Sequence, residues 1–113
     1  MSNFTPTRRE YGTGDRRWAR NFLALDTHGV TLKGDAWPAG QVIPSGTAVA
    51  LDGDGYGVPA TDTAEGLLVN DWRASAGDHL VAVAHGGTVD RRYLPEDFPS
   101  AVEASLPAIK FIN

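Results

Sequence analysis

The side chains that could bind a metal ion or take part in catalysis are few and scattered. The histidines are His28, His79 and His85, and no two of them have the i, i+4 spacing of a helical zinc motif. On one regular strand, His79 and His85 would lie on the same face, yet about 20 Å apart at the ~3.3 Å rise of a strand. That separation is too large for one metal ion. We therefore expect histidines at strand ends or in turns, and no metal site.

The acidic loop Asp52-Gly53-Asp54-Gly55-Tyr56-Gly57 resembles the beginning of a calcium-binding loop. Counted from Asp52, Asp54 and Gly57 fit the third and sixth positions of an EF-hand, but Tyr56 is a poor ligand at the fifth. Thr63 stands at the twelfth position, where a bidentate Glu is needed. The flanking segments also have the pattern of strands. A Gly/Asp hairpin turn is the favoured interpretation, with calcium binding as the alternative.

Other catalytic signatures are missing from the sequence. The chain has no cysteine, which excludes disulfides, thiol catalysis and cysteine-based zinc sites. It also has no GxSxG nucleophile elbow, P-loop or dinucleotide fingerprint. Glu96 and Asp97 are adjacent in a proline-flanked loop, whereas a glycosidase pair must face each other across a cleft. The sequence therefore predicts a binding protein without a cofactor, and not an enzyme.

Charge divides the chain into two parts. The net charge is −4, but residues 1–20 have five arginines against Glu10 and Asp15, and residues 21–113 have five basic and twelve acidic side chains. This pattern predicts an extended basic N-terminal arm (1–20) and a β-rich domain (21–113), with the arm docking on an acidic surface. The acidic domain would repel phosphates, so we expect no nucleic-acid partner.

No apolar run reaches the ~20 residues of a membrane helix, so no membrane partner is expected. The first residues also lack the apolar core of a signal peptide, so we expect no export by that route.

Aromatic side chains accompany the arginines of the arm, and this composition is typical of a segment that orders on binding. Phe4, Tyr11 and Trp18 are large anchors of the kind that make interfaces tight. For Trp18 the alternative is packing on the domain's own core. The candidate contact residues of the arm are Arg8, Arg9, Tyr11, Arg16, Arg17 and Trp18.

The elements that must position these residues are short, because thirteen Gly and seven Pro residues interrupt the chain. A helix of at most two turns is expected from Ser100, with Ser100 as cap and Glu103 three residues on, ending before Pro107. The fold class is mainly β, a small barrel or sandwich with one short C-terminal helix. Strands are expected at 22–25 and 30–32 around a turn at 26–29, at 47–51, at 66–69, at 79–85, at 88–94 after a Gly86-Gly87 turn, and at 109–112.

Several segments in a fixed order resemble the lambda-type head decoration proteins, in the form seen in tailed phages of actinobacteria. The resemblance covers residues 20–113. It rests on 40–51 (GQVIPSGTAVAL), on the GLLV and VAV strands, and on 85–89 (HGGTV), 93–95 (YLP) and 106–111 (LPAIKF).

This resemblance implies a β-rich domain that forms homotrimers on the outer surface of the virion capsid and clamps neighbouring subunits of the major capsid protein. It implies an arm that lies on the capsid, and no catalytic residues. The alternative is a stand-alone β-barrel binding module for a carbohydrate or a host surface, with Trp37 and Trp72 as stacking platforms.

Overall fold

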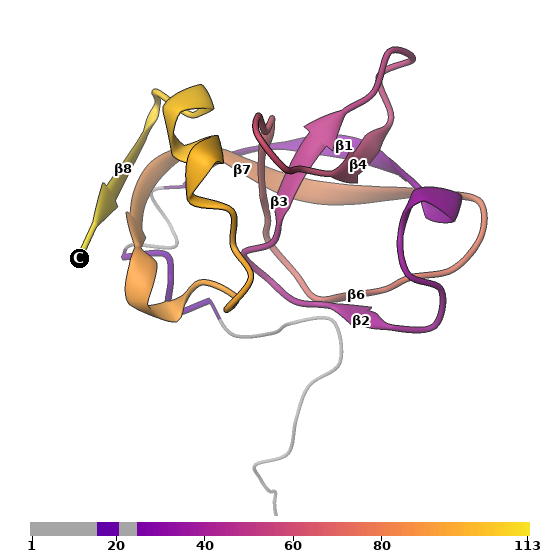
Figure 1. The fold of residues 1–113 in the computed structure, drawn as a ribbon, viewed down its shortest axis with the longest axis horizontal. Coiled ribbons are helices and arrows are strands. Elements are labelled where there is room, and N and C mark those ends of the chain that lie inside the picture. Colours follow the sequence, from indigo (N-terminus) through magenta and orange to yellow (C-terminus); the bar gives the residue numbers. More distant parts are fainter. Residues whose placement is uncertain (1–15, 21–24) are drawn as a thin grey trace, which may run out of the picture.

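Five strands form a closed β-barrel, as the sequence predicts for the fold class (Figure 1). The computed structural model describes residues 16–20 and 25–113. Neighbouring strands follow the order β1-β4-β3-β5-β7, and β1 pairs back with β7 to close the ring. The strands are β1 (Asp26–Lys33), β3 (Ala48–Leu51), β4 (Gly57–Pro59), β5 (Gly66–Leu68) and β7 (Asp78–Asp90).

Strand β7 extends over 13 residues, and its length corrects two sequence predictions. The chain does not reverse at Gly86-Gly87, nor at 26–29, because β1 and β7 pair antiparallel from Lys33↔Asp78 to Asp26↔Gly86. The register shifts beside Asp26, and Gly87 has a φ of 130°. A Cβ on Gly86 would lie 3.0 Å from the Cβ of Asp26. The glycines therefore permit an irregular, close pairing of two strands and not a turn.

A small two-stranded sheet lies beside the barrel and forms a flap. It consists of β2 (Val42–Ile43) and β6 (Trp72–Arg73), which run side by side in Figure 1. The 3-10 helix η2 (Gly34–Ala36) precedes β2. The chain turns at 44–46, where Gly46 has a φ of 94° and the Thr47 hydroxyl donates to the Pro44 carbonyl. This turn leads directly into β3.

The C-terminal elements gather at one end of the molecule (Figure 1). They are the 3-10 helices η3 (Arg91–Tyr93) and η4 (Ser100–Ser105), followed by β8 (Ile109–Ile112), which pairs parallel with the end of β7. Strand β8 confirms the predicted final strand. The capping box expected at Ser100 is not formed. Pro99 occupies the cap position without a side-chain hydrogen bond, and Glu103 binds Arg91 instead.

Two sets of buried side chains lie on opposite faces of the barrel strands. Neighbours in sequence alternate between them, as in Ala48/Val49, Leu67/Leu68 and Ala84/Val83, which is the period of two of a strand. Because both faces are buried, these strands have continuous apolar sequences. The barrel core contains Val30, Leu32, Trp37, Ile43, Val49, Leu68, Ala74 and Val83. The outer core contains Trp18, Ala19, Ala48, Leu67, Val69, Ala84, Val89, Val102, Leu106 and Ile109.

The segment 18–20, at the end of the predicted arm, contacts this domain through backbone pairing. Ala19 forms an antiparallel bridge with Val89. The N–H of Asp90 donates to the Trp18 carbonyl at 2.6 Å, and the N–H of Arg20 donates to the Thr88 carbonyl. These contacts attach the segment to the side of β7 opposite β8. Within the described part of the chain, no helix is long and apolar enough to cross a bilayer.

Candidate functional site

Arginine and tyrosine side chains from two distant segments meet where the arm joins the domain. The guanidinium of Arg17 lies 4.7 Å from the centre of the Tyr93 ring, and that of Arg92 lies 5.4 Å from it. Arg91 precedes Arg92 on the same 3-10 helix, η3. We call Arg17, Arg91, Arg92 and Tyr93 the arginine–tyrosine cluster. Cations over an aromatic face are held by its quadrupole, so the ring fixes where the guanidinium groups lie.

A buried carboxylate holds one side of the cluster. Asp90 is only 1% exposed, and its carboxylate accepts two hydrogen bonds from the Arg92 guanidinium, at 3.1 and 2.7 Å. It also accepts the backbone N–H of Arg92, which caps η3. The hydrogen bonds from Arg92 hold the pKa of Asp90 far below its usual range. Arg92 is therefore fixed by an ionised partner at any physiological pH.

A second ion pair orients Arg91. Its guanidinium donates to both carboxylate oxygens of Glu103, at 2.9 and 2.7 Å, and lies 5.7 Å from the centre of the Phe111 ring. The hydrogen bond from Arg91 lowers the pKa of Glu103. A hollow of about 360 Å³ lies beside the two arginines, between η3 and η4. The cluster thus presents oriented guanidinium groups at a concave surface, an arrangement suited to carboxylates of a partner.

The structure divides the predicted arm residues into three groups. Arg8, Arg9 and Tyr11 lie outside the described residues. Arg16 and Arg17 lie on the surface of the domain, where Arg16 donates to the side chain of Asn70 and Arg17 joins the cluster.

Trp18 is not a surface contact residue. Its side chain is fully buried, and its indole N–H donates to the hydroxyl of Ser45 at 3.0 Å. This corrects the assignment of Trp18 to a capsid-binding surface, because a side chain without exposed area cannot touch a partner.

The sequence analysis missed Arg91, Arg92 and Tyr93 as site residues. They were assigned to a returning strand, because Gly86-Gly87 was interpreted as a turn. The composition Arg-Arg-Tyr repeats that of the arm, and this was the signal that could have found them.

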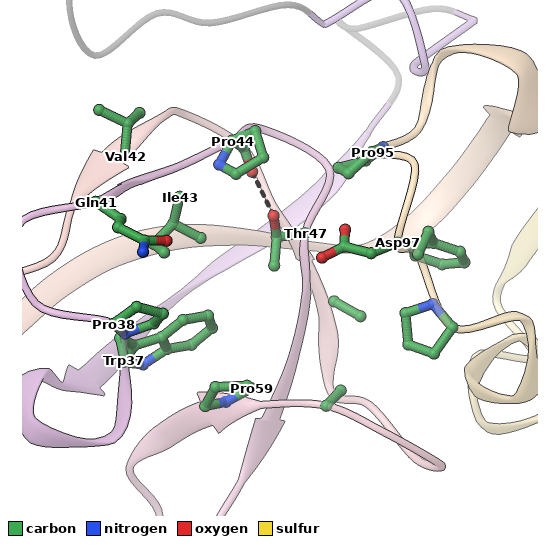
Figure 2. A pocket seen from close by; sticks show the side chains of 14 residues that line it. Trp37, Pro38, Gln41, Val42, Ile43, Pro44, Thr47, Pro59, Pro95 and Asp97 are labelled. Carbon is green, nitrogen blue, oxygen red and sulfur yellow. Dashed lines mark hydrogen bonds between the residues drawn. The ribbon is translucent and has the colours of Figure 1, made fainter.

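An apolar groove lies between the flap and the loop that follows η3 (Figure 2). Its volume is about 300 Å³, and Asp97 directs its carboxylate into the groove, toward Thr47. Trp37 forms part of the wall but is buried, and its indole N–H donates to the Gly57 carbonyl at 3.2 Å. Trp72 packs edge-on against Trp37, with ring centres 5.8 Å apart. Trp37 is therefore not free to act as a stacking platform.

Histidines from two strands come together on another part of the barrel. The rings of His28 in β1 and His85 in β7 are 4.3 Å apart. His28 lies 3.4 Å from Glu65, and His85 lies 3.6 Å from Asp26. They lie within paired strands and not at strand ends or in turns, contrary to the sequence expectation, while His79 packs against Trp72. Among the described residues, no group of three or more His, Asp or Glu side chains is arranged to hold a metal ion.

The acidic loop forms the expected hairpin between β3 and β4. The Asp52 carboxylate accepts the backbone N–H groups of Asp54 and Tyr56, at 2.8 and 3.0 Å. The bond from Tyr56 is the main cause of the lowered pKa of Asp52. Asp52 thus stabilises its own turn.

Comparison with known proteins adds no relative to this description. No family model, no curated protein and no solved structure matches the chain.

Proposed function

We propose that the protein is a decoration protein of a tailed-phage head. It would bind the outer surface of the mature capsid as a homotrimer and stabilise the contacts between subunits of the major capsid protein. The observation that supports the proposal is the arginine–tyrosine cluster, where Arg17 at the root of the basic arm and Arg92 of the domain lie over the same Tyr93 ring. The arm would supply the positive charge toward an acidic region of the shell, and the guanidinium groups of the domain, each paired with a carboxylate, would add oriented side chains beside it.

The chemistry of the cluster suits a lasting contact with another protein. Arginine and tyrosine are the residue types that dominate binding energy at interfaces. Asp90 and Glu103 fix the guanidinium groups of Arg92 and Arg91 in advance, so less side-chain entropy is lost on binding. Three copies in a trimer would bind together, and the combined affinity would exceed that of one site.

The alternative of a stand-alone carbohydrate-binding module has less support. Such modules stack sugars on exposed aromatic rings. Here Trp37 is buried, and Trp72 packs against both Trp37 and His79.

Co-sedimentation with capsids tests the proposal. Heads of the encoding phage, assembled without this protein, are mixed with the wild-type chain, with Arg17→Glu and with Lys33→Glu. Lys33 is an exposed cation of β1 and provides a control for the change in charge. We expect Arg17→Glu to weaken binding by at least about tenfold, the loss of one interface anchor multiplied over a trimer, and Lys33→Glu to bind normally.

Two results would contradict the proposal. One is full binding of Arg17→Glu. The other is a capsid reconstruction that shows the wild-type chain as isolated single copies and not in threes.

A further inference from the structure

The apolar groove has an unusual lining for a surface feature. Five of its fourteen lining residues are prolines, and Trp37, Val42, Ile43 and Phe98 add further apolar area. Proline and tryptophan change conformation little, so the walls are rigid and an occupant would not have to order them. Val42 is 45% exposed at the rim. An exposed apolar surface of this kind marks a binding site for a peptide or an aromatic side chain.

The polar groups of the groove indicate the charge of its occupant. The carboxylate of Asp97 points between the two walls toward Thr47 (Figure 2). The hydroxyl of Thr47 already donates to the Pro44 carbonyl at 2.7 Å. A segment that places an aromatic ring between the walls and a cation near Asp97 would satisfy both the apolar lining and the carboxylate.

The side chain of Trp18, in the described part of the N-terminal segment, lies close to one wall of this groove. A Cβ added to Gly46 would lie 3.1 Å from both Trp18 and Pro95, and Pro95 lines the groove together with Pro44 and Thr47. Trp18 therefore lies directly beneath this wall, and its indole binds Ser45, the neighbour of Pro44. Arg16, where the described residues begin, is only two positions before Trp18 in the sequence.

The sequence of that segment has the required chemistry. Tyr11 provides the aromatic ring, and Arg8 and Arg9 provide cations two and three residues before it. Five peptide units separate Tyr11 from Arg16, a reach of about 17 Å when extended. Gly12 and Gly14 lie in between and let the chain bend sharply. Because Tyr11 is joined to the domain through so few residues, its effective concentration near the groove would be on the order of millimolar.

We propose that the groove is the docking site of this chain's own N-terminal segment, with the ring of Tyr11 between the proline-rich walls and Arg8 or Arg9 beside Asp97. The proposal does not rest on the role in capsid decoration, because it follows from the groove, the attachment point and the composition of the segment. Its consequence is that Tyr11 and the apolar walls shield each other from water when no partner is bound.

Photo-crosslinking in the full-length chain tests this directly. Benzoylphenylalanine replaces Tyr11, the protein is irradiated at two concentrations, and the products are mapped by mass spectrometry. We expect crosslinks to 41–44 or 95–99 in products with the mass of one chain, at a yield that does not change on dilution. Crosslinks confined to other parts of the chain would overturn the proposal. Crosslinks to the groove only between two chains, with a yield that falls on dilution, would also overturn it.

A matched pair of variants sharpens the result. Val42→Arg places a cation at the rim of the groove, while Leu51→Arg makes the same change at a residue of equal exposure, 43%, that does not line it. We expect Val42→Arg to lower the yield of groove crosslinks by about fivefold or more, the effect of disrupting one anchor contact. Leu51→Arg should leave the yield unchanged. Equal yields in both variants would contradict the docking, and circular dichroism confirms that both variants are folded.

Discussion

The barrel core and the outer core use the same strands but differ in what closes them. The barrel core lies between strands that are neighbours in the sheet, and the flap covers it. The outer core lies on the other face of those strands, and Trp18, Val102 and Ile109 cover it from three segments that are far apart in sequence. Each core contains one buried tryptophan, Trp37 or Trp18. One face of the barrel therefore depends on pairing among the strands of the ring, and the other on the ends of the chain.

Replacing either buried tryptophan by alanine is expected to give the largest loss in the free energy of unfolding. Trp18→Ala should lower the free energy of unfolding by about 3–5 kcal/mol, because it leaves a closed cavity in the outer core. Trp37→Ala should lie near the bottom of that range, because its site borders the groove and water can fill the space. Urea denaturation measures both. Should Trp18→Ala not fold, Trp18→Phe keeps most of the volume and should cost about 1–2 kcal/mol for the lost hydrogen bond. If Trp37→Ala lost more unfolding free energy than Trp18→Ala, the outer core would not depend more strongly on its tryptophan than the barrel core does.

The two indole N–H groups have different kinds of hydrogen-bond acceptor. Trp18 donates to a buried side chain, Ser45, whose hydroxyl in turn donates to the Val69 carbonyl, whereas Trp37 donates to a backbone carbonyl. Ser45→Ala leaves an indole N–H and a carbonyl without partners, and should lower the free energy of unfolding by about 2–3 kcal/mol. The exposed Ser100 provides the control, and Ser100→Ala should be nearly neutral in the same denaturation experiment. Equal effects would show that the buried hydroxyl is not part of the outer core's stability.

The barrel core should be sensitive to added volume. A Cβ at Gly57 would lie 2.6 Å from Leu32, 3.0 Å from Val30 and 3.1 Å from Val49. Gly57→Ala should therefore cost about 1–3 kcal/mol through overpacking. At Gly53, in the same hairpin, an added Cβ meets no atom within 4 Å, so Gly53→Ala serves as the control. Thermal unfolding compares the two, and a Gly57→Ala variant as stable as Gly53→Ala would show that the barrel core is loosely packed.

The smallest change in the free energy of unfolding is expected for the ion pair between Glu103 of η4 and Arg91 of η3. Glu103→Gln removes the pair with Arg91 and should cost no more than about 1 kcal/mol, since the arginine is partly exposed. Because the pKa of Glu103 is lowered in the folded protein, its contribution is present above the unfolded pKa of about 4.3 and disappears as the pH falls through the folded value. Denaturation should therefore show a smaller difference between wild type and variant at pH 3 than at pH 7. A difference that does not shrink as the pH falls would contradict the ion-pair explanation.

The sequence predicted the local parts of the fold. The hairpin after Asp52 and the strands near 48–51 and 109–112 depend on residues close in the chain, such as the carboxylate of Asp52, which accepts the N–H of Asp54. The predicted turns at 26–29 and 86–87 were wrong, because the pairing of β1 with β7 overrides the turn preference of the glycines. There the glycines permit close approach of the strands, and a single sequence does not distinguish this use from a reversal.

The candidate site was only partly predictable for the same reason. Composition identified Arg16 and Arg17, but their neighbours in space come from another part of the chain. Arg92 and Tyr93 reach Arg17 because β7 continues past Gly87 and η3 begins at its end. The burial of Trp18 likewise depends on Ser45, 27 residues away.

Strand β7 also has a consequence for how the protein is made. It pairs with β1, β5 and β8 and forms a bridge with Ala19, and the ring closes only between residues far apart in sequence, from Lys33↔Asp78 to Asp26↔Gly86. Such nonlocal pairing is typical of domains that fold in milliseconds to seconds, and not in microseconds. During synthesis β1 cannot pair with β7 until β7 has been made. The apolar outer face of the barrel strands also stays exposed until the C-terminal elements that cover it have left the ribosome. The nascent chain would therefore pass through a stage in which it is vulnerable to aggregation and to proteases.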